Sequence, residues 1–134
     1  MEKLIIEATV NSPRIILDPE SKKFEFSGES RPENVRNFYL PVLEWLEKYT
    51  KHESGLGKPQ RTSALDCVFN FEYFNSTSAK YILDIFKSLN ALNGLGVNLD
   101  IKWFYEEDDE DMLEVGEEMS RMSKLKFEYV ISDN

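Results

Sequence analysis

The sequence predicts an α/β fold of two layers, in which the helices cover mainly one face of a mostly parallel or mixed β-sheet. Strand-like and helix-like segments alternate from about residue 35 to the end of the chain, which is typical of successive parallel crossovers. The strand-like segments also alternate between apolar and polar residues. Parallel strands buried on both faces have continuous apolar runs instead. We therefore expect one face of the sheet to stay comparatively polar.

Three short strands are expected in the N-terminal part of the chain, at residues 4–8, 14–17 and 23–27. The clusters Asn11-Ser12-Pro13 and Asp18-Pro19-Glu20-Ser21 separate them, and such clusters are turn signals. These runs predict an N-terminal β-hairpin or meander at one edge of the sheet.

The first helix is expected to begin at Ser30, which would form a capping box with Glu33 and place Pro32 in the first turn. Apolar residues then recur at three- and four-residue spacing, which indicates one apolar helix face. Pro41 lies inside this pattern and is expected to kink or split the helix. The glycine- and proline-containing stretch 52–61 is the most loop-like part of the chain.

The rest of the chain alternates strands near 65–73, 97–105 and 125–131 with two further helices. The second helix is expected from about Thr77 to Asn93-Gly94, and the third carries Met112, Val115, Met119 and Met122. The helices should pack on the sheet face that bears the apolar strand residues, with the polar strand residues on the opposite face. The expected contacts join Val35, Phe38, Trp45, Ile82, Leu83 and Phe86 to Phe69, Phe71, Leu99 and Ile101, with Asp66, Asn70, Asp100 and Lys102 pointing away.

Length and charge limit the possible functions. A chain of 134 residues favours a single domain, residues 1–134. Its 16 Lys and Arg against 25 Asp and Glu give a net charge of −9, which repels nucleic acid and anionic lipid, so neither is expected as a partner. No apolar run is long enough for a membrane span, no signal peptide is recognisable, and the lone Cys67 forms no internal disulfide. We expect a cytoplasmic protein.

Catalytic and cofactor motifs are lacking in the sequence. His52, the single histidine, is expected in a loop, and Cys67 lies on the apolar side of a strand, where a buried inert thiol is the favoured interpretation. The chain has no phosphate loop, no dinucleotide glycine fingerprint and no Cys/His metal spacing. The prediction is a protein that is not an enzyme, with no catalytic residues, no metal and no cofactor.

The acidic run 106–111 offers an alternative function. It could hold a cation, which would make the protein a small metal-dependent hydrolase or a ligand-binding protein, although the run lacks the spacing of a calcium loop. The favoured interpretation is the solvated start of a helix, where carboxylates face the positive end of the helix dipole. A purely structural oligomer subunit is a third possibility, and the oligomeric state stays open.

The tetrad Asn75-Ser76-Thr77-Ser78 lies where a strand passes into a helix. Asn, Ser and Thr are favoured N-caps, so the tetrad could simply cap the helix. It contains more capping residues than one cap requires, and it follows a strand expected near the centre of the sheet, where open α/β sheets place their sites. A phosphate there would meet free helix N–H groups. A cap and a phosphorylation switch both remain open on these grounds.

Several segments, in their order and spacing, resemble the SiaC family of bacterial regulatory phosphoproteins over nearly the whole chain. They are Ser12-Pro13-Arg14-Ile15, Gly28-Glu29-Ser30-Arg31-Pro32-Glu33-Asn34, residues 38–46, Phe74-Asn75-Ser76-Thr77-Ser78-Ala79-Lys80, and residues 103–112 from Trp103 to Met112.

The resemblance implies a fold similar to STAS-domain anti-anti-sigma factors and a partner-switching function. A serine/threonine kinase of the anti-sigma-factor-like ATPase type would phosphorylate the protein, and a PP2C-type phosphatase would reverse this. The unmodified form would bind and activate a target, which in one branch of the family is a diguanylate cyclase that promotes cyclic-di-GMP signalling and biofilm formation.

The resemblance also implies which residues would act. The family's phosphoacceptor is usually a Thr directly after the Asn of the tetrad, a position held here by Ser76, with Thr77 as the alternative acceptor. Arg31 stands where the family often has an aromatic residue, so the target need not be the same. The expected partner-binding residues are Ser30, Arg31, Pro32, Glu33, Asn34, Asn75, Ser76, Thr77, Ser78, Trp103 and Tyr105.

Overall fold

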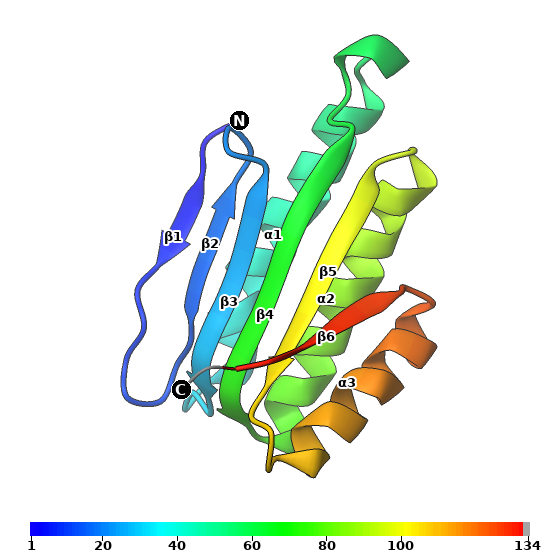
Figure 1. Cartoon of the computed structure of the whole chain (residues 1–134). Coiled ribbons are helices and arrows are strands. Elements are labelled where there is room, and N and C mark those ends of the chain that lie inside the picture. Colours follow the sequence, from blue (N-terminus) through cyan, green and yellow to red (C-terminus); the bar gives the residue numbers. More distant parts are fainter. Residues whose placement is uncertain (133–134) are drawn as a thin grey trace.

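A six-stranded mixed sheet forms one layer of the protein, and three helices form the other (Figure 1). The computed structural model describes residues 1–132. The strands follow the sheet order β1-β2-β3-β4-β5-β6, and all three helices lie on the same face of the sheet. The elements are β1 (Leu4–Ile6), β2 (Arg14–Asp18), β3 (Lys23–Ser30), α1 (Val35–Ser54), the short 3₁₀ helix η1 (Lys58–Gln60), β4 (Ala64–Phe74), α2 (Ser76–Gly94), β5 (Asn98–Tyr105), α3 (Glu110–Ser123) and β6 (Phe127–Ile131).

Strands β1, β2 and β3 pair antiparallel, while β3, β4, β5 and β6 pair parallel. The predicted N-terminal meander and the two-layer arrangement are therefore confirmed. In the parallel part, each helix connects one strand to its neighbour, so the carboxyl ends of β3, β4 and β5 and the amino ends of the helices meet at one edge of the sheet (Figure 1). We call this edge, with the loops that leave it, the switch edge.

The register of the sheet confirms the predicted division of its faces. Pairing places one row of buried apolar residues side by side across five strands, and these side chains point toward the helices: Leu17, Phe24, Cys67, Ile101 and Phe127. The neighbouring row, shifted by one residue, faces away from the helices and is mostly polar: Ile16, Glu25, Val68, Lys102 and Glu128. A slip of one residue would exchange the two rows, so burial fixes the register.

Aromatic side chains fill the centre of the core. Phe69 of β4 stacks on Phe26 of β3 with 4.4 Å between ring centroids, and Phe86 of α2 lies 4.3 Å from Phe69 on the helix side. Trp103 of β5 is 1% exposed, and its ring lies 5.9 Å from that of Phe127. This aromatic layer joins α2 to the sheet.

The predicted start of the first helix was wrong. Ser30 ends β3 and is fully buried, while Asn34 is the N-cap of α1, its side chain accepting a hydrogen bond from the N–H of Asn37 at 3.0 Å. Asn is as good an N-cap as Ser, so local chemistry alone did not decide between them. Ser30 is held in the sheet by long-range bonds to Ser78.

Pro41 was expected to kink or split this helix. It does not split α1, which runs unbroken from Val35 to Ser54. The missing N–H of Pro41 leaves only the carbonyl of Asn37 without its helical partner, and both residues are exposed, so water can replace that bond. His52 belongs to the last helical turn of α1 rather than to a loop, and it is exposed there.

Candidate functional site

The predicted phosphoacceptor region lies at the switch edge, where β4 passes into α2. Asn75 is the N-cap of α2, and its side-chain oxygen accepts a hydrogen bond from the N–H of Ser78 at 2.9 Å. The hydroxyl of Thr77 donates to the same oxygen at 3.0 Å. Asn75 therefore satisfies one of the free N–H groups of the first turn, as the composition of the tetrad predicted.

The hydroxyls of the tetrad differ in their availability. Ser76 is exposed in the first turn of α2, and within residues 1–132 its hydroxyl makes no hydrogen bond. Thr77 is also exposed, but its hydroxyl is engaged by the cap. Ser78 is fully buried. A kinase could reach Ser76 without displacing any of these contacts.

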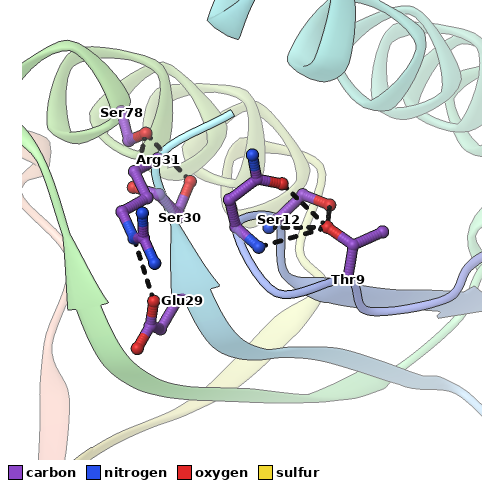
Figure 2. Close-up of polar contacts among 7 residues, drawn as sticks. Thr9, Ser12, Glu29, Ser30, Arg31 and Ser78 are labelled. Atoms are coloured by element: carbon purple, nitrogen blue, oxygen red, sulfur yellow. Dashed lines mark hydrogen bonds and ion pairs between the residues drawn. The ribbon is translucent and has the colours of Figure 1, made fainter. Parts of the chain in front are cut away.

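A buried cluster of hydroxyl groups joins Ser78, the last residue of the tetrad, to Ser30 and Tyr39, and Figure 2 shows its Ser30–Ser78 part. The hydroxyl of Ser78 donates to the carbonyl of Ser30 at 2.9 Å, and the hydroxyl of Ser30 donates to that of Ser78 at 2.9 Å. The hydroxyl of Tyr39 contacts that of Ser30, and burial raises the pKa of Tyr39 to about 12. The N–H of Asn75 also donates to the carbonyl of Ser30, at 3.1 Å. The starts of α1 and α2 are thus joined through the last residue of β3.

The segment 31–34 and a turn from the N-terminal meander lie beside this cluster. Arg31 is exposed, and its guanidinium Nε lies 3.0 Å from the Glu29 carboxylate. The backbone N–H of Arg31 donates to the carbonyl of Asn11 at 2.8 Å. The hydroxyl of Thr9 accepts a hydrogen bond from the N–H of Ser12 at 3.0 Å, which closes the turn next to Arg31 (Figure 2). Residues 12–15 belong to the segments that resemble the family, but the sequence did not indicate that they lie at this edge.

The predicted partner-binding residues divide by exposure. The structure brings most of them to the switch edge, where Arg31, Glu33, Asn34, Ser76 and Thr77 are exposed and Pro32, Asn75 and Tyr105 are half-buried. Ser30, Ser78 and Trp103 are buried, so they support the edge from below and cannot contact a partner directly. Trp103 instead donates from its indole Nε1 to the carbonyl of Met112 at 3.0 Å, in the core.

The acidic run begins a helix, as its favoured interpretation predicted. Asp109 is the N-cap of α3 and accepts a hydrogen bond from the N–H of Met112 at 3.0 Å, while Glu110 and Asp111 occupy the first turn. Over residues 1–132, no group of three or more His, Cys, Asp or Glu side chains is arranged to hold a metal ion. Burial raises the pKa of the Cys67 thiol to about 12, so this thiol stays protonated at neutral pH. None of the helices described is long and apolar enough to cross a membrane.

An apolar groove next to Ser76 was missed by sequence reasoning. It lies between α2 and α3 and has a volume of about 520 Å³. Ser76 and Lys80 line it on the side of α2, and Glu118 lines it on the side of α3. Its apolar lining residues are Phe74, Ala79, Leu83, Val115, Met119 and Met122. The spacing of Val115, Met119 and Met122 on one face of α3 could have signalled it.

Comparison with known proteins gives one family. The model of the SiaC family of regulatory phosphoproteins matches residues 6–132. An uncharacterised protein of Pseudomonas aeruginosa is 29% identical over 127 residues, which cover 95% of this chain and 94% of the relative. The family match and the likeness to this relative therefore both extend over nearly the whole chain.

Two solved structures of SiaC resemble this chain over nearly its whole length. The crystal structure of apo-SiaC from Pseudomonas aeruginosa is 25% identical, with a TM-score of 0.77 over 96% of this chain and 98% of that one. A chain in the crystal structure of the diguanylate cyclase SiaD in complex with its activator SiaC, also from Pseudomonas aeruginosa, is 26% identical, with a TM-score of 0.79 over 96% of this chain and 99% of that one. The arrangement of sheet and helices is therefore shared with SiaC.

Proposed function

The chain belongs to the SiaC family of regulatory phosphoproteins, and we propose that it is a non-catalytic partner switch controlled by phosphorylation of Ser76. A partner kinase of the anti-sigma-factor-like ATPase type adds the phosphate, and a PP2C-type phosphatase removes it. The unmodified form binds and activates a target. SiaC of Pseudomonas aeruginosa is the activator of a diguanylate cyclase, and a cyclase of this type is the target we propose here.

The exposed Ser76 hydroxyl, in the first turn of α2, is the observation that carries this proposal. It is the one hydroxyl of the tetrad that is exposed and makes no hydrogen bond within residues 1–132. The helix N-terminus tolerates an added anion, since free N–H groups and the helix dipole face it. A partner surface tolerates it poorly, because a phosphate adds a charge of about −1.5 to −2 that must be desolvated or paired on docking.

Thr77 is the less favoured acceptor on structural grounds. Its hydroxyl donates to the cap oxygen of Asn75, and a phosphate on it would remove that donor. Modification of Thr77 would therefore disturb the start of α2, whereas modification of Ser76 would leave the cap in place.

Mass spectrometry and a cyclase assay test the switch together. After incubation with the partner kinase, we expect phosphate on Ser76, and no phosphorylation of Ser76→Ala. The matched control Thr77→Ala should be phosphorylated as the unchanged protein is. The unmodified protein should stimulate the cyclase, and the phosphorylated protein should not. Phosphate on Thr77 alone would show that Thr77 is the acceptor instead of Ser76. Equal stimulation of the cyclase by the unmodified and the phosphorylated protein would refute the switch.

A further inference from the structure

The groove between α2 and α3 shows features of a docking surface rather than of an incompletely packed core. Its volume is about 520 Å³ and its lining is mainly apolar. Met122 is 51% exposed there, although it continues the buried face formed by Met112 and Met119. Methionine side chains adapt their shape to a partner and are common on such surfaces. With the half-buried Phe74, Leu83 and Val115, Met122 forms one apolar surface, and such a surface indicates an interaction site.

The geometry of the walls selects a helical partner. Both walls are helices whose backbone groups bond internally, so the groove offers no strand edge to an extended peptide. Val115, Met119 and Met122 follow one another at four- and three-residue spacing on α3. The apolar face of an amphipathic helix, with anchors at the same spacing, is the element that fits such a groove.

The charge around the groove selects the composition of that helix. Glu118 lines the groove on the α3 wall, and the exposed Glu114 and Asp111 precede it by four and seven residues, on the same side of the helix. The α2 wall instead presents Lys80. A helix with Lys or Arg along the flank over α3, and a carboxylate on the flank over α2, matches both walls.

We propose that this groove is the docking site for an amphipathic helix of the partner protein, bound with its basic flank over α3. The inference rests on the proposed function and extends it, because Ser76 lines the same groove one helical turn before Lys80. A phosphate on Ser76 would lie beside Lys80 and reverse the charge of the α2 wall. It would then repel the carboxylate flank of the docked helix.

The methionines of the chain give a direct test. The chain has four, of which Met119 and Met122 line the groove, while Met1 and Met112 lie outside it. The probe is a synthetic helix of about 18 residues with Leu at positions i, i+3, i+4 and i+7, Lys on one flank and Glu on the other. Its binding is followed in the NMR spectrum of protein labelled at the methionine methyl groups.

Addition of the probe should shift the signals of Met119 and Met122 and leave those of Met1 and Met112 unchanged. A second probe with Glu on both flanks should bind at least about tenfold more weakly. Met122→Glu should weaken binding of the first probe by a similar factor, since it places a charge in the apolar lining of the groove. The matched control is Leu40→Glu, a residue 37% exposed in the groove between α1 and α2, and it should leave binding unchanged.

The outcomes separate this inference from the proposed function. Absence of methyl shifts, or shifts confined to Met1 and Met112, would overturn the docking site even if the protein activates a cyclase. Protein carrying phosphoserine at position 76 should bind the probe at least about tenfold more weakly than unmodified protein. Equal binding of both forms, with shifts at Met119 and Met122, would support the docking site and contradict its control by phosphate on Ser76.

Discussion

The backbone of Gly116 in α3 lies so close to the indole of Trp103 that a Cβ at position 116 would stand 2.5 Å from the indole Nε1. Trp103 is 1% exposed, and its Nε1–H donates to the carbonyl of Met112 in the same helix. The close approach and the hydrogen bond together fix α3 against β5. Because α3 forms one wall of the groove beside Ser76, this contact also positions the proposed docking surface.

Gly116→Ala should therefore destabilise the protein. Alanine gains about 1 kcal/mol of helix propensity over glycine, but overpacking against a buried ring costs about 1–3 kcal/mol. We expect a net loss in the free energy of unfolding, measured by urea denaturation. Gly94→Ala is the control, because a Cβ there meets no atom within 4 Å. Equal or greater stability of Gly116→Ala would show that α3 can move away from Trp103 without loss.

The buried hydroxyl cluster beneath the tetrad gives a second prediction. Ser78→Ala removes the donor to the Ser30 carbonyl and the acceptor of the Ser30 hydroxyl. The Ser30 carbonyl keeps the Asn75 N–H and the Ser30 hydroxyl keeps Tyr39, so the cost is that of two lost hydrogen bonds, about 0.5–1.5 kcal/mol each. Urea denaturation should show this loss for Ser78→Ala and a smaller one for the exposed Ser54→Ala. If the two variants were equally stable, the cluster would not hold the starts of α1 and α2 together.

A third prediction concerns alkaline pH. Burial raises the pKa of Cys67 to about 12 and that of Tyr39 to about 12, from ordinary values of 9.0 and 10.0. Both groups are neutral below these ordinary values, so their contribution to stability is complete there. Above about pH 9 the unfolded chain loses protons that the folded chain retains, and the free energy of unfolding falls until the pH passes the folded values.

Urea midpoints measured between pH 8 and pH 11 should show this fall. Tyr39→Phe cannot ionise at this position, so its midpoint should fall less steeply with pH, even if the variant is less stable at pH 8. The Cys67 thiol should also resist a thiol reagent in the folded protein at pH 8 and react in urea. A pH dependence identical in Tyr39→Phe and the unchanged protein would exclude Tyr39 as a cause.

The parts of the fold that depend on local periodicity could be predicted from the sequence. Alternation along each strand gave the register, because side chains of a strand point to opposite faces in turn, and the row from Leu17 to Phe127 confirms it. The start of α1 could not be predicted in the same way. Both Ser30 and Asn34 are good caps, and the choice depends on hydrogen bonds between Ser30 and Ser78, which are 48 residues apart.

The candidate site shows the same division. The cap by Asn75 follows from local chemistry, while the exposure of Ser76 and the burial of Ser78 depend on how α2 packs against β3. Trp103 was expected at a partner surface. It lies two residues after the buried Ile101 in β5, however, so its side chain points to the same buried face of the sheet. The groove between α2 and α3 depends on the separation of two helices, which periodicity within either helix does not encode.

The last prediction separates the effect of phosphate on folding from its effect on docking. A phosphate on Ser76 lies at the first position of α2, and the cap between Asn75 and Ser78 does not use the Ser76 hydroxyl. An anion at a helix N-terminus is stabilising by about 0.3–1 kcal/mol, so the Tm should stay the same or rise by a few degrees. Asn75→Ala should instead lower it, because a lost N-cap costs about 0.5–2 kcal/mol. Calorimetry of the phosphorylated protein, the Asn75→Ala variant and the unmodified protein gives the three Tm values. A clear fall in Tm on phosphorylation would mean that the phosphate unfolds the start of α2. The switch would then not act by changing the charge of the surface that the partner meets.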